Sequence, residues 1–172
     1  MSNFLRKQKG VTQVEFTLIA LAVLLVIFSI MEFALYFYSI QMANEVTRRA
    51  ARLATVCYIA DRDDIPQLPA VTALYPPGFS PENLTISYLD KDGNNVDVSG
   101  FLTSPPADTD ALNATFSTIR FVKAEVDYTF KFLVLSLLIN AVGASPEFQT
   151  ILPAESLGVL RPESGLNDHE DC

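Results

Sequence analysis

The chain of 172 residues is long enough for one compact domain and a membrane anchor, with little room for a second domain. It carries 12 Lys and Arg against 20 Asp and Glu, and this net charge of −8 leaves no basic surface for binding nucleic acid. Hydrophobic residues make up 49% of the chain, and much of this excess lies in one stretch near the N-terminus. The composition therefore excludes a nucleic-acid partner and directs attention to that stretch.

The N-terminal segment combines a basic leader, residues 1–10, with a long apolar run. The leader has three basic residues and no acidic one: Arg6, Lys7 and Lys9. The run from Phe16 to Met31 contains no charge, and it continues from Phe33 to Ile40 after the single Glu32. At 1.5 Å per residue, about 20 residues cross a hydrocarbon core of roughly 30 Å. The run therefore predicts one membrane-spanning helix.

The charges around this run predict its orientation. Basic residues directly before a span favour a cytoplasmic N-terminus, which places the rest of the chain outside the cytoplasm. Arg48, Arg49 and Arg52 lie on the other side, but they begin some distance past the span and Glu45 offsets part of their charge. Large aromatic residues follow the run where a signal peptidase would need small ones. We therefore expect the segment to remain as an anchor.

Glu15 is the unusual residue of the N-terminal segment, because it places a carboxylate at the edge of a hydrocarbon run. Such a group is costly in a membrane and indicates a partner or a function. A cut after Gly10 would create a cationic amino group at Val11, one helical turn away, which could pair with this Glu15 or with that of a neighbouring subunit. The alternative is a glutamate at the interface that reaches toward the lipid headgroups.

The residues from Lys9 to Phe16 resemble the type IV prepilin signal, in which a basic leader ends in glycine and a glutamate is the fifth residue of the mature chain. The Glu15-Phe16 pair is similar to that of TadE-like pseudopilins of tight-adherence (Flp) pilus systems. The resemblance extends through Met31-Glu32-Phe33 to the Ala- and Arg-rich stretch between Asn44 and Ala54.

This resemblance implies a role and a set of processing residues. It implies that prepilin peptidase, an aspartyl membrane protease, cuts after Gly10 to leave Val11 as the new terminus. Glu15, followed by Phe16, is the implied determinant of processing or assembly. The implied function is that of a minor pilin or pseudopilin in a type IV or Tad-type pilus, a non-catalytic role in adhesion. The implied partners are other pilin-like subunits and the pilus assembly platform.

Beyond Ile40 the helical pattern becomes amphipathic and predicts one helix over residues 11–60. Its apolar side has residues at steps of three and four: Met42, Val46, Ala50, Leu53 and Cys57. Its three arginines, Arg48, Arg49 and Arg52, either form a solvated face or contact acidic partners or lipid headgroups.

Residues 61–172 predict a β-rich domain outside the cytoplasm. The proline-rich stretch 61–81 indicates an irregular connection. Alternation over Leu84–Tyr88, a turn at Asp90–Asn95 and the pair Val96 and Val98 predict a hairpin. Asp90, Asp92 and Asn94 resemble part of a calcium loop, but the glycine comes too early and the required glutamate is missing. No metal site is predicted.

The last part of the chain predicts the rest of an antiparallel sheet. Residues Ile119–Phe132 alternate, with Val122, Ala124, Val126, Tyr128, Phe130 and Phe132 on one side. Residues Gln149–Arg161 predict an edge strand limited by prolines. The apolar run Leu133–Val142 allows a short helix, a core segment or a patch on the membrane, and we favour a core segment or a subunit contact. The fold class is therefore α+β, with the long helix packed on a small sheet of about three to four strands.

The remaining residues leave two questions open. Cys57 and Cys172 either form a disulfide in an exported domain or remain as two free thiols. With a single histidine, His169, and no Cys/His pair or phosphate-binding glycine loop, the chain is predicted to be no enzyme and to take no cofactor or small-molecule substrate. The expected location is the bacterial inner membrane and periplasm, with incorporation into a pilus left open. The alternative function is an uncleaved, single-pass, membrane-anchored binding or accessory module.

Overall fold

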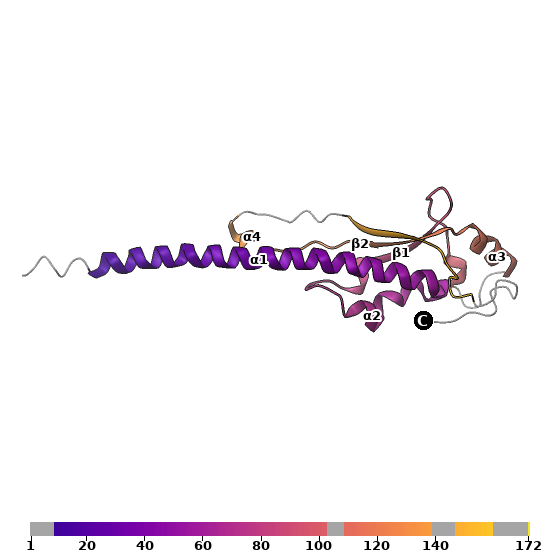
Figure 1. The fold of residues 1–172 in the computed structure, drawn as a ribbon, viewed down its shortest axis with the longest axis horizontal. Coiled ribbons are helices and arrows are strands. Elements are labelled where there is room, and N and C mark those ends of the chain that lie inside the picture. Colours follow the sequence, from indigo (N-terminus) through magenta and orange to yellow (C-terminus); the bar gives the residue numbers. More distant parts are fainter. Residues whose placement is uncertain (1–8, 103–108, 139–146, 160–171) are drawn as a thin grey trace, which may run out of the picture. The chain divides into compact units, whose positions relative to one another are not determined.

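A computed structural model describes residues 9–102, 109–138, 147–159 and 172 (Figure 1). The chain divides into two compact units. The helix unit consists of residues 1–38 and 129–144, and the sheet unit consists of residues 39–128 and 145–172. Helix α1, Lys9–Val56, runs through both units, in close agreement with the helix predicted over residues 11–60. The predicted α+β class is confirmed.

The sheet has three antiparallel strands in the order β1-β2-β3. Strand β1, Leu84–Leu89, pairs with β2, Phe121–Val126, and places Leu84 opposite Val126. Strand β3, Phe148–Pro153, pairs with the other edge of β2 and places Phe148 opposite Val126. The predicted extended segment at Gln149–Arg161 is confirmed as an edge strand, although the strand ends at Pro153.

Short helical turns fill the connections. Among the described residues they are η1 Ile59–Asp63, η2 Ile65–Gln67, α2 Pro69–Thr72, η3 Pro81–Asn83, η4 Ser99–Phe101, α3 Thr109–Thr118 and α4 Leu135–Leu138. Three of these turns, η2, α2 and η3, have a proline at one of their first two positions. Proline suits the first turn because its missing N–H needs no partner there. Pro66, Pro69 and Pro81 of the predicted irregular connection therefore start short turns.

Two strand predictions were wrong in extent. The expected hairpin closes with a single bridge between Leu89 and Asn95, after which the chain enters η4, so residues 96–98 form no strand. Strand β2 ends at Val126 and does not extend to Phe132. Its end is fixed because the Asp127 N–H donates to the Asn83 carbonyl at 2.9 Å, and the Asn83 side-chain amide donates to the Asp127 carbonyl at 2.8 Å.

The core of the sheet unit forms between the last part of α1 and one side of the sheet. The fully buried apolar residues of this part are Ala43, Val46, Ala50, Ala51 and Ala54 of α1 and Cys57 directly after it. Met42 and Leu53, which we expected on this face, are only half-buried. Compared with the predicted face, the buried face of the helix is therefore rotated toward the alanines. Their small side chains let the sheet approach the helix closely. From the strands, Tyr88, Val122 and Ala124 are buried, and burial raises the pKa of the Tyr88 phenol well above its usual value.

The described part of the apolar run Leu133–Val142 belongs to the helix unit. Residues 133–135 donate hydrogen bonds to Glu32 of α1, and α4 begins at Leu135. Leu133 is 79% exposed, so the favoured core segment of the sheet domain is wrong for this residue. Residues 139–142 lie outside the described residues.

A tight turn at Leu157-Gly158 closes the sheet unit against the end of α1. The Leu157 N–H donates to the Thr55 carbonyl at 3.0 Å, and Leu157 is buried. Gly158 has a φ of +77°, and a Cβ added to it would lie only 2.5 Å from the Cα of Tyr58. Glycine is therefore required at this position both by its backbone angle and by the close approach of residue 58.

We predict that Gly158→Ala destabilises the sheet unit more than Gly78→Ala does. Gly78 has a similar φ of +81°, but no atom lies within 4 Å of the place that an added Cβ would take. Both changes carry the left-handed backbone penalty of about 1–2 kcal/mol, and only Gly158→Ala adds a steric term of about 1–3 kcal/mol. Thermal unfolding of the full chain in detergent measures the difference. Equal midpoints for the two variants would contradict the prediction.

Candidate functional site

The predicted processing site lies at the beginning of α1. The helix begins at Lys9, so the peptide bond between Gly10 and Val11 is in its first turn. The leader residues 1–8 lie outside the described residues. Glycine costs about 1 kcal/mol relative to alanine in a helix, so Gly10 weakens the first turn of α1.

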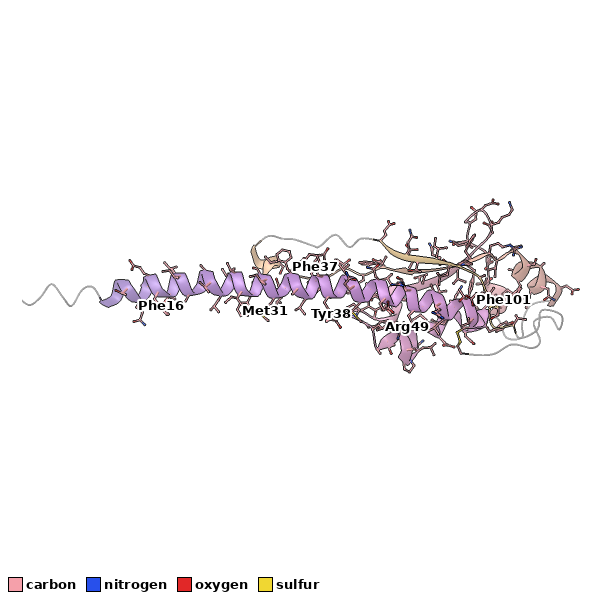
Figure 2. The ribbon with its side chains drawn as sticks, in the orientation of Figure 1. Phe16, Met31, Phe37, Tyr38, Arg49 and Phe101 are labelled. Atoms are coloured by element: carbon pink, nitrogen blue, oxygen red, sulfur yellow. A yellow bond between two sulfur atoms is a disulfide. The ribbon has the colours of Figure 1, made fainter. Side chains whose placement is uncertain are left out.

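Glu15 and Phe16 are exposed on α1, one turn past that bond. Phe16 is 72% exposed and projects from the helix with no other element beside it among those that the structure describes (Figure 2). Within the same described ranges, Glu15 has no hydrogen bond or ion pair. The nearby Thr17 is satisfied by its own helix, because its hydroxyl donates to the Gln13 carbonyl at 2.8 Å. Glu15 is therefore a carboxylate available to a partner.

The first part of α1 has apolar side chains all around it. Its exposed large residues include Val14, Leu18, Ile19, Leu21, Val23, Leu24, Val26, Ile27, Phe28, Ile30, Phe33, Leu35 and Phe37. A window of this helix reaches a mean hydropathy of 2.8 with only 6% of it buried, and the helix is long and apolar enough to cross a membrane. A helix that is apolar on every side is stable in lipid or when enclosed by other helices.

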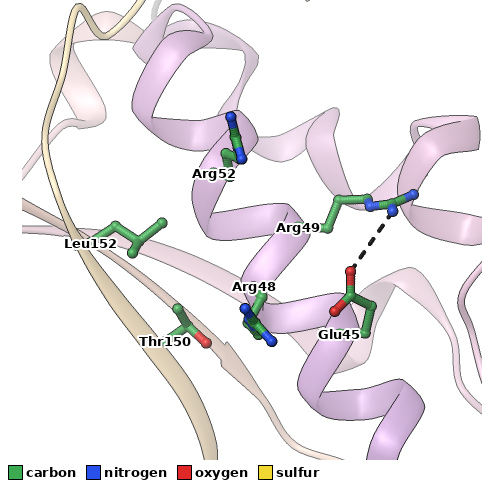
Figure 3. Close-up of a pocket in the computed structure, with 6 residues that line it drawn as sticks. All are labelled: Glu45, Arg48, Arg49, Arg52, Thr150 and Leu152. Atoms are coloured by element: carbon green, nitrogen blue, oxygen red, sulfur yellow. Dashed lines mark ion pairs between the residues drawn. The ribbon is translucent and has the colours of Figure 1, made fainter.

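An open groove of about 350 Å³ between α1 and β3 is lined by three arginines of the helix, Arg48, Arg49 and Arg52. Arg48 and Arg52 line this groove together with Thr150 and Leu152 of β3 (Figure 3). Arg49 instead contacts the Glu45 carboxylate at 3.8 Å and donates to the Ala70 carbonyl at 3.2 Å. Its ion pair is exposed and contributes little to stability. Both predicted alternatives for the arginines, a solvated face or contact with acidic partners or lipid headgroups, are compatible with this groove.

The structure joins Cys57 to Cys172 by a disulfide with a Cα–Cα distance of 5.5 Å. Cys57 is fully buried at the end of α1, and the Cys172 N–H donates to the Asp61 carboxylate at 2.9 Å. The bond thus fastens the end of the chain to the sheet unit.

The Asp90 carboxylate stabilises the turn at residues 90–94. Asp90 accepts hydrogen bonds from the N–H groups of Asp92 at 2.8 Å and Asn94 at 2.9 Å, and the Asn94 amide lowers the pKa of the Asp90 carboxyl. The side chain therefore closes its own turn. Within the described part of the chain, no three His, Cys, Asp or Glu residues come together as metal ligands.

The fold and the site define a class: a chain with one N-terminal apolar helix that continues into an α+β unit. The family model described as "TadE-like protein" matches residues 10–52, a quarter of the chain. The resemblance to TadE-like proteins is thereby confirmed over residues 10–52. Proteins of this family are structural components of the pilin type. No curated protein and no solved structure matches the chain.

Sequence reasoning missed the role of Glu32. We treated it as an interruption of the apolar run, whereas its carboxylate accepts three backbone hydrogen bonds from residues 133–135. The signal was present in two parts, a glutamate inside a span and a second apolar run. Nothing local in the sequence connects these two parts, because they lie about 100 positions apart.

We predict that loss of the disulfide lowers the stability of the sheet unit by about 2–4 kcal/mol, because the bond closes a long loop in the unfolded chain. Cys172→Ser tests this without changing the buried Cys57. The midpoint of thermal unfolding in detergent should fall for Cys172→Ser and, to the same extent, for the wild-type chain with dithiothreitol. The variant itself should not respond to dithiothreitol. A wild-type midpoint that is insensitive to the reductant would contradict the prediction.

Proposed function

We propose that the chain is a non-catalytic pilin-like subunit that is cut after Gly10 by a prepilin peptidase and then used in assembly of a Tad-type pilus. It is anchored in the bacterial inner membrane by α1, with the sheet unit outside the cytoplasm. Other pilin-like subunits and the assembly platform are its partners.

The observation that carries this proposal is the arrangement at the start of α1. The family match begins at Gly10, and Glu15 lies one turn past the Gly10–Val11 bond as an exposed carboxylate without a described partner. Cleavage at this bond supplies the missing partner. A free α-amino group has a pKa of about 7.7–8.0, so it is largely cationic near neutral pH.

This new charge can act within one subunit or between two. In a helix, residues four apart are neighbours, so the amino group of Val11 lies within reach of its own Glu15. In a bundle of such helices it can equally pair with Glu15 of an adjacent subunit. Because both charges lie at the edge of the hydrocarbon region, their pairing lowers the cost of keeping Glu15 there. This gives cleavage a direct effect on assembly.

Two observations support the proposed orientation. The leader carries Arg6, Lys7 and Lys9 directly before the span, as expected on the cytoplasmic side. The Cys57–Cys172 disulfide lies in the sheet unit, and such bonds persist in oxidising compartments such as the periplasm. Both point to a cytoplasmic leader and an exported sheet unit.

We predict that mature protein from the native host begins at Val11 and that Gly10→Val blocks the cut while leaving membrane insertion intact. A valine at this position adds bulk where the peptidase must bind the chain. N-terminal sequencing and intact mass of the membrane fraction measure both results, and Val14→Ala serves as a control that should be cut normally. A wild-type chain that starts at Met1 or Ser2 would refute the processing and favour the uncleaved accessory module.

We also predict that Glu15→Gln weakens association with other pilin-like subunits more than Glu45→Gln does. The first change removes the carboxylate next to the new terminus, whereas the second removes only an exposed partner of Arg49. Co-purification of neighbouring pilus components with the tagged chain measures the association. Equal recovery with both variants, at normal processing, would show that the Glu15 charge has no part in assembly.

A further inference from the structure

Glu32 is a second carboxylate within the apolar part of α1, and unlike Glu15 it is 9% exposed. At 1.5 Å per residue it lies about 24 Å along the helix from Phe16. A span that begins near Phe16 extends for roughly 30 Å, so Glu32 falls within the hydrocarbon region. A charged residue costs on the order of 2.5–3.5 kcal/mol at the centre of a membrane helix and less toward its ends, so Glu32 needs a partner there.

The partners of Glu32 are three consecutive backbone N–H groups. Leu133 and Val134 donate to Oε1 at 2.5 and 2.6 Å, and Leu135 donates to Oε2 at 2.9 Å. These amides lie before and at the first residue of α4, where no carbonyl of that helix can accept from them. Glu32 and the three amides therefore satisfy one another, and each side would be costly in lipid without the other.

Aromatic contacts hold the same segment along α1. The ring of Tyr36 lies 5.7 Å from that of Phe130 and 5.4 Å from that of Phe132. The ring of Phe33 lies 6.0 Å from that of Phe132. The chain thus runs antiparallel to α1, from Tyr36 toward Glu32. Aromatic pairs at these distances contribute about 0.5–1.5 kcal/mol each beyond the area that they bury.

The outer surface of this segment is suited to lipid. Leu133 is 79% exposed, and Phe33 and Leu35 of the adjacent helix are 48% and 51% exposed. Between Thr129 and Leu138 the sequence has one charge, Lys131, whose long side chain can reach the headgroups while its stem stays in lipid.

The connectivity requires the segment to return to the side from which it came. It leaves the sheet after β2 and rejoins it at β3, and these two strands are direct neighbours. An apolar stretch of this length is too short to span a membrane; it suits a buried core element, an interfacial segment or a re-entrant segment. The exposure of Leu133 argues against a buried core element. Non-helical backbone is tolerated at membrane depth only where protein groups satisfy its N–H and C=O groups. Glu32 supplies such a group.

We propose that residues 130–138 enter the bilayer beside α1 as a re-entrant segment and that the Glu32 carboxylate fastens them there. The inference rests on the proposed membrane anchoring of α1. In this proposal the membrane anchor has two parts, α1 and residues 130–138. The binding partner of residues 130–138 is the lipid acyl chains.

Tryptophan fluorescence tests this directly, because the chain contains no tryptophan. Three exposed sites are replaced one at a time: Leu133→Trp in the segment, Ile27→Trp in the span and Ile151→Trp in β3. Each full-length variant is reconstituted in phosphatidylcholine vesicles with and without bromine on the acyl chains. We expect brominated lipid to remove about half or more of the emission of Leu133→Trp and Ile27→Trp, since both lie within the hydrocarbon region, and to leave Ile151→Trp unchanged.

The role of Glu32 is tested by adding Glu32→Leu to the Leu133→Trp and Ile27→Trp chains. This change removes the acceptor but favours insertion of α1, so quenching should be lost at residue 133 and kept at residue 27. Met31→Ala, at an exposed neighbouring position, is the matched control and should change neither.

Each other outcome has a distinct meaning. If Leu133→Trp behaves like Ile151→Trp while Ile27→Trp is quenched, the re-entrant segment is refuted and the anchor stands. Quenching at residue 133 that survives Glu32→Leu overturns the fastening by Glu32. If Ile27→Trp is not quenched, the proposed anchoring of α1 itself fails.

Discussion

The apolar surface of α1 between Val14 and Phe37 is the feature on which the rest of the helix unit depends, because its exposure to water is unfavourable. Any polar group on this stretch needs a partner from the protein. The Ser29 hydroxyl donates to the Leu25 carbonyl of its own helix, and the Glu32 carboxylate is satisfied by three amides from the β2–β3 connection. Glu15 is the carboxylate for which the described residues offer no partner. The proposed cut after Gly10 would provide one.

The same helix changes character once it enters the sheet unit. There its apolar residues form a stripe of small side chains, including Ala43, Ala50 and Ala54, that packs on the sheet. Its arginines lie on the other side, and Arg48 and Arg52 line the groove beside β3. One continuous helix thus serves two environments, because its pattern shifts from apolar on all sides to amphipathic. In the proposed pilin-like subunit, one element would thus both anchor the chain and form part of the core of the sheet unit.

The β2–β3 connection is unusual in its length and in its apolar sequence. Its neighbouring strands need only a short turn, yet the chain between Val126 and Phe148 is long and carries an apolar sequence. Long connections of this kind in compact proteins usually have a function of their own. Here the aromatic residues Phe130 and Phe132, which alternate as if β2 continued, pack on α1 in the helix unit instead. The alternation therefore reflects an apolar contact surface and not a longer strand.

The sequence by itself determined the long helix, its change of pattern near residue 40 and the buried side of β2. These features follow from local periodicity, charge and spacing. The processing segment proposed at Gly10–Phe16 rests on a sequence motif and stays a prediction. Only the tertiary structure decided where β2 ends, because the Asn83 side chain caps it from another element, and that residues 96–98 leave the sheet. Only it brought Glu32 to the amides of residues 133–135 and Cys172 to Cys57. Such pairings depend on the path of the chain between distant positions, which neither partner's local sequence encodes.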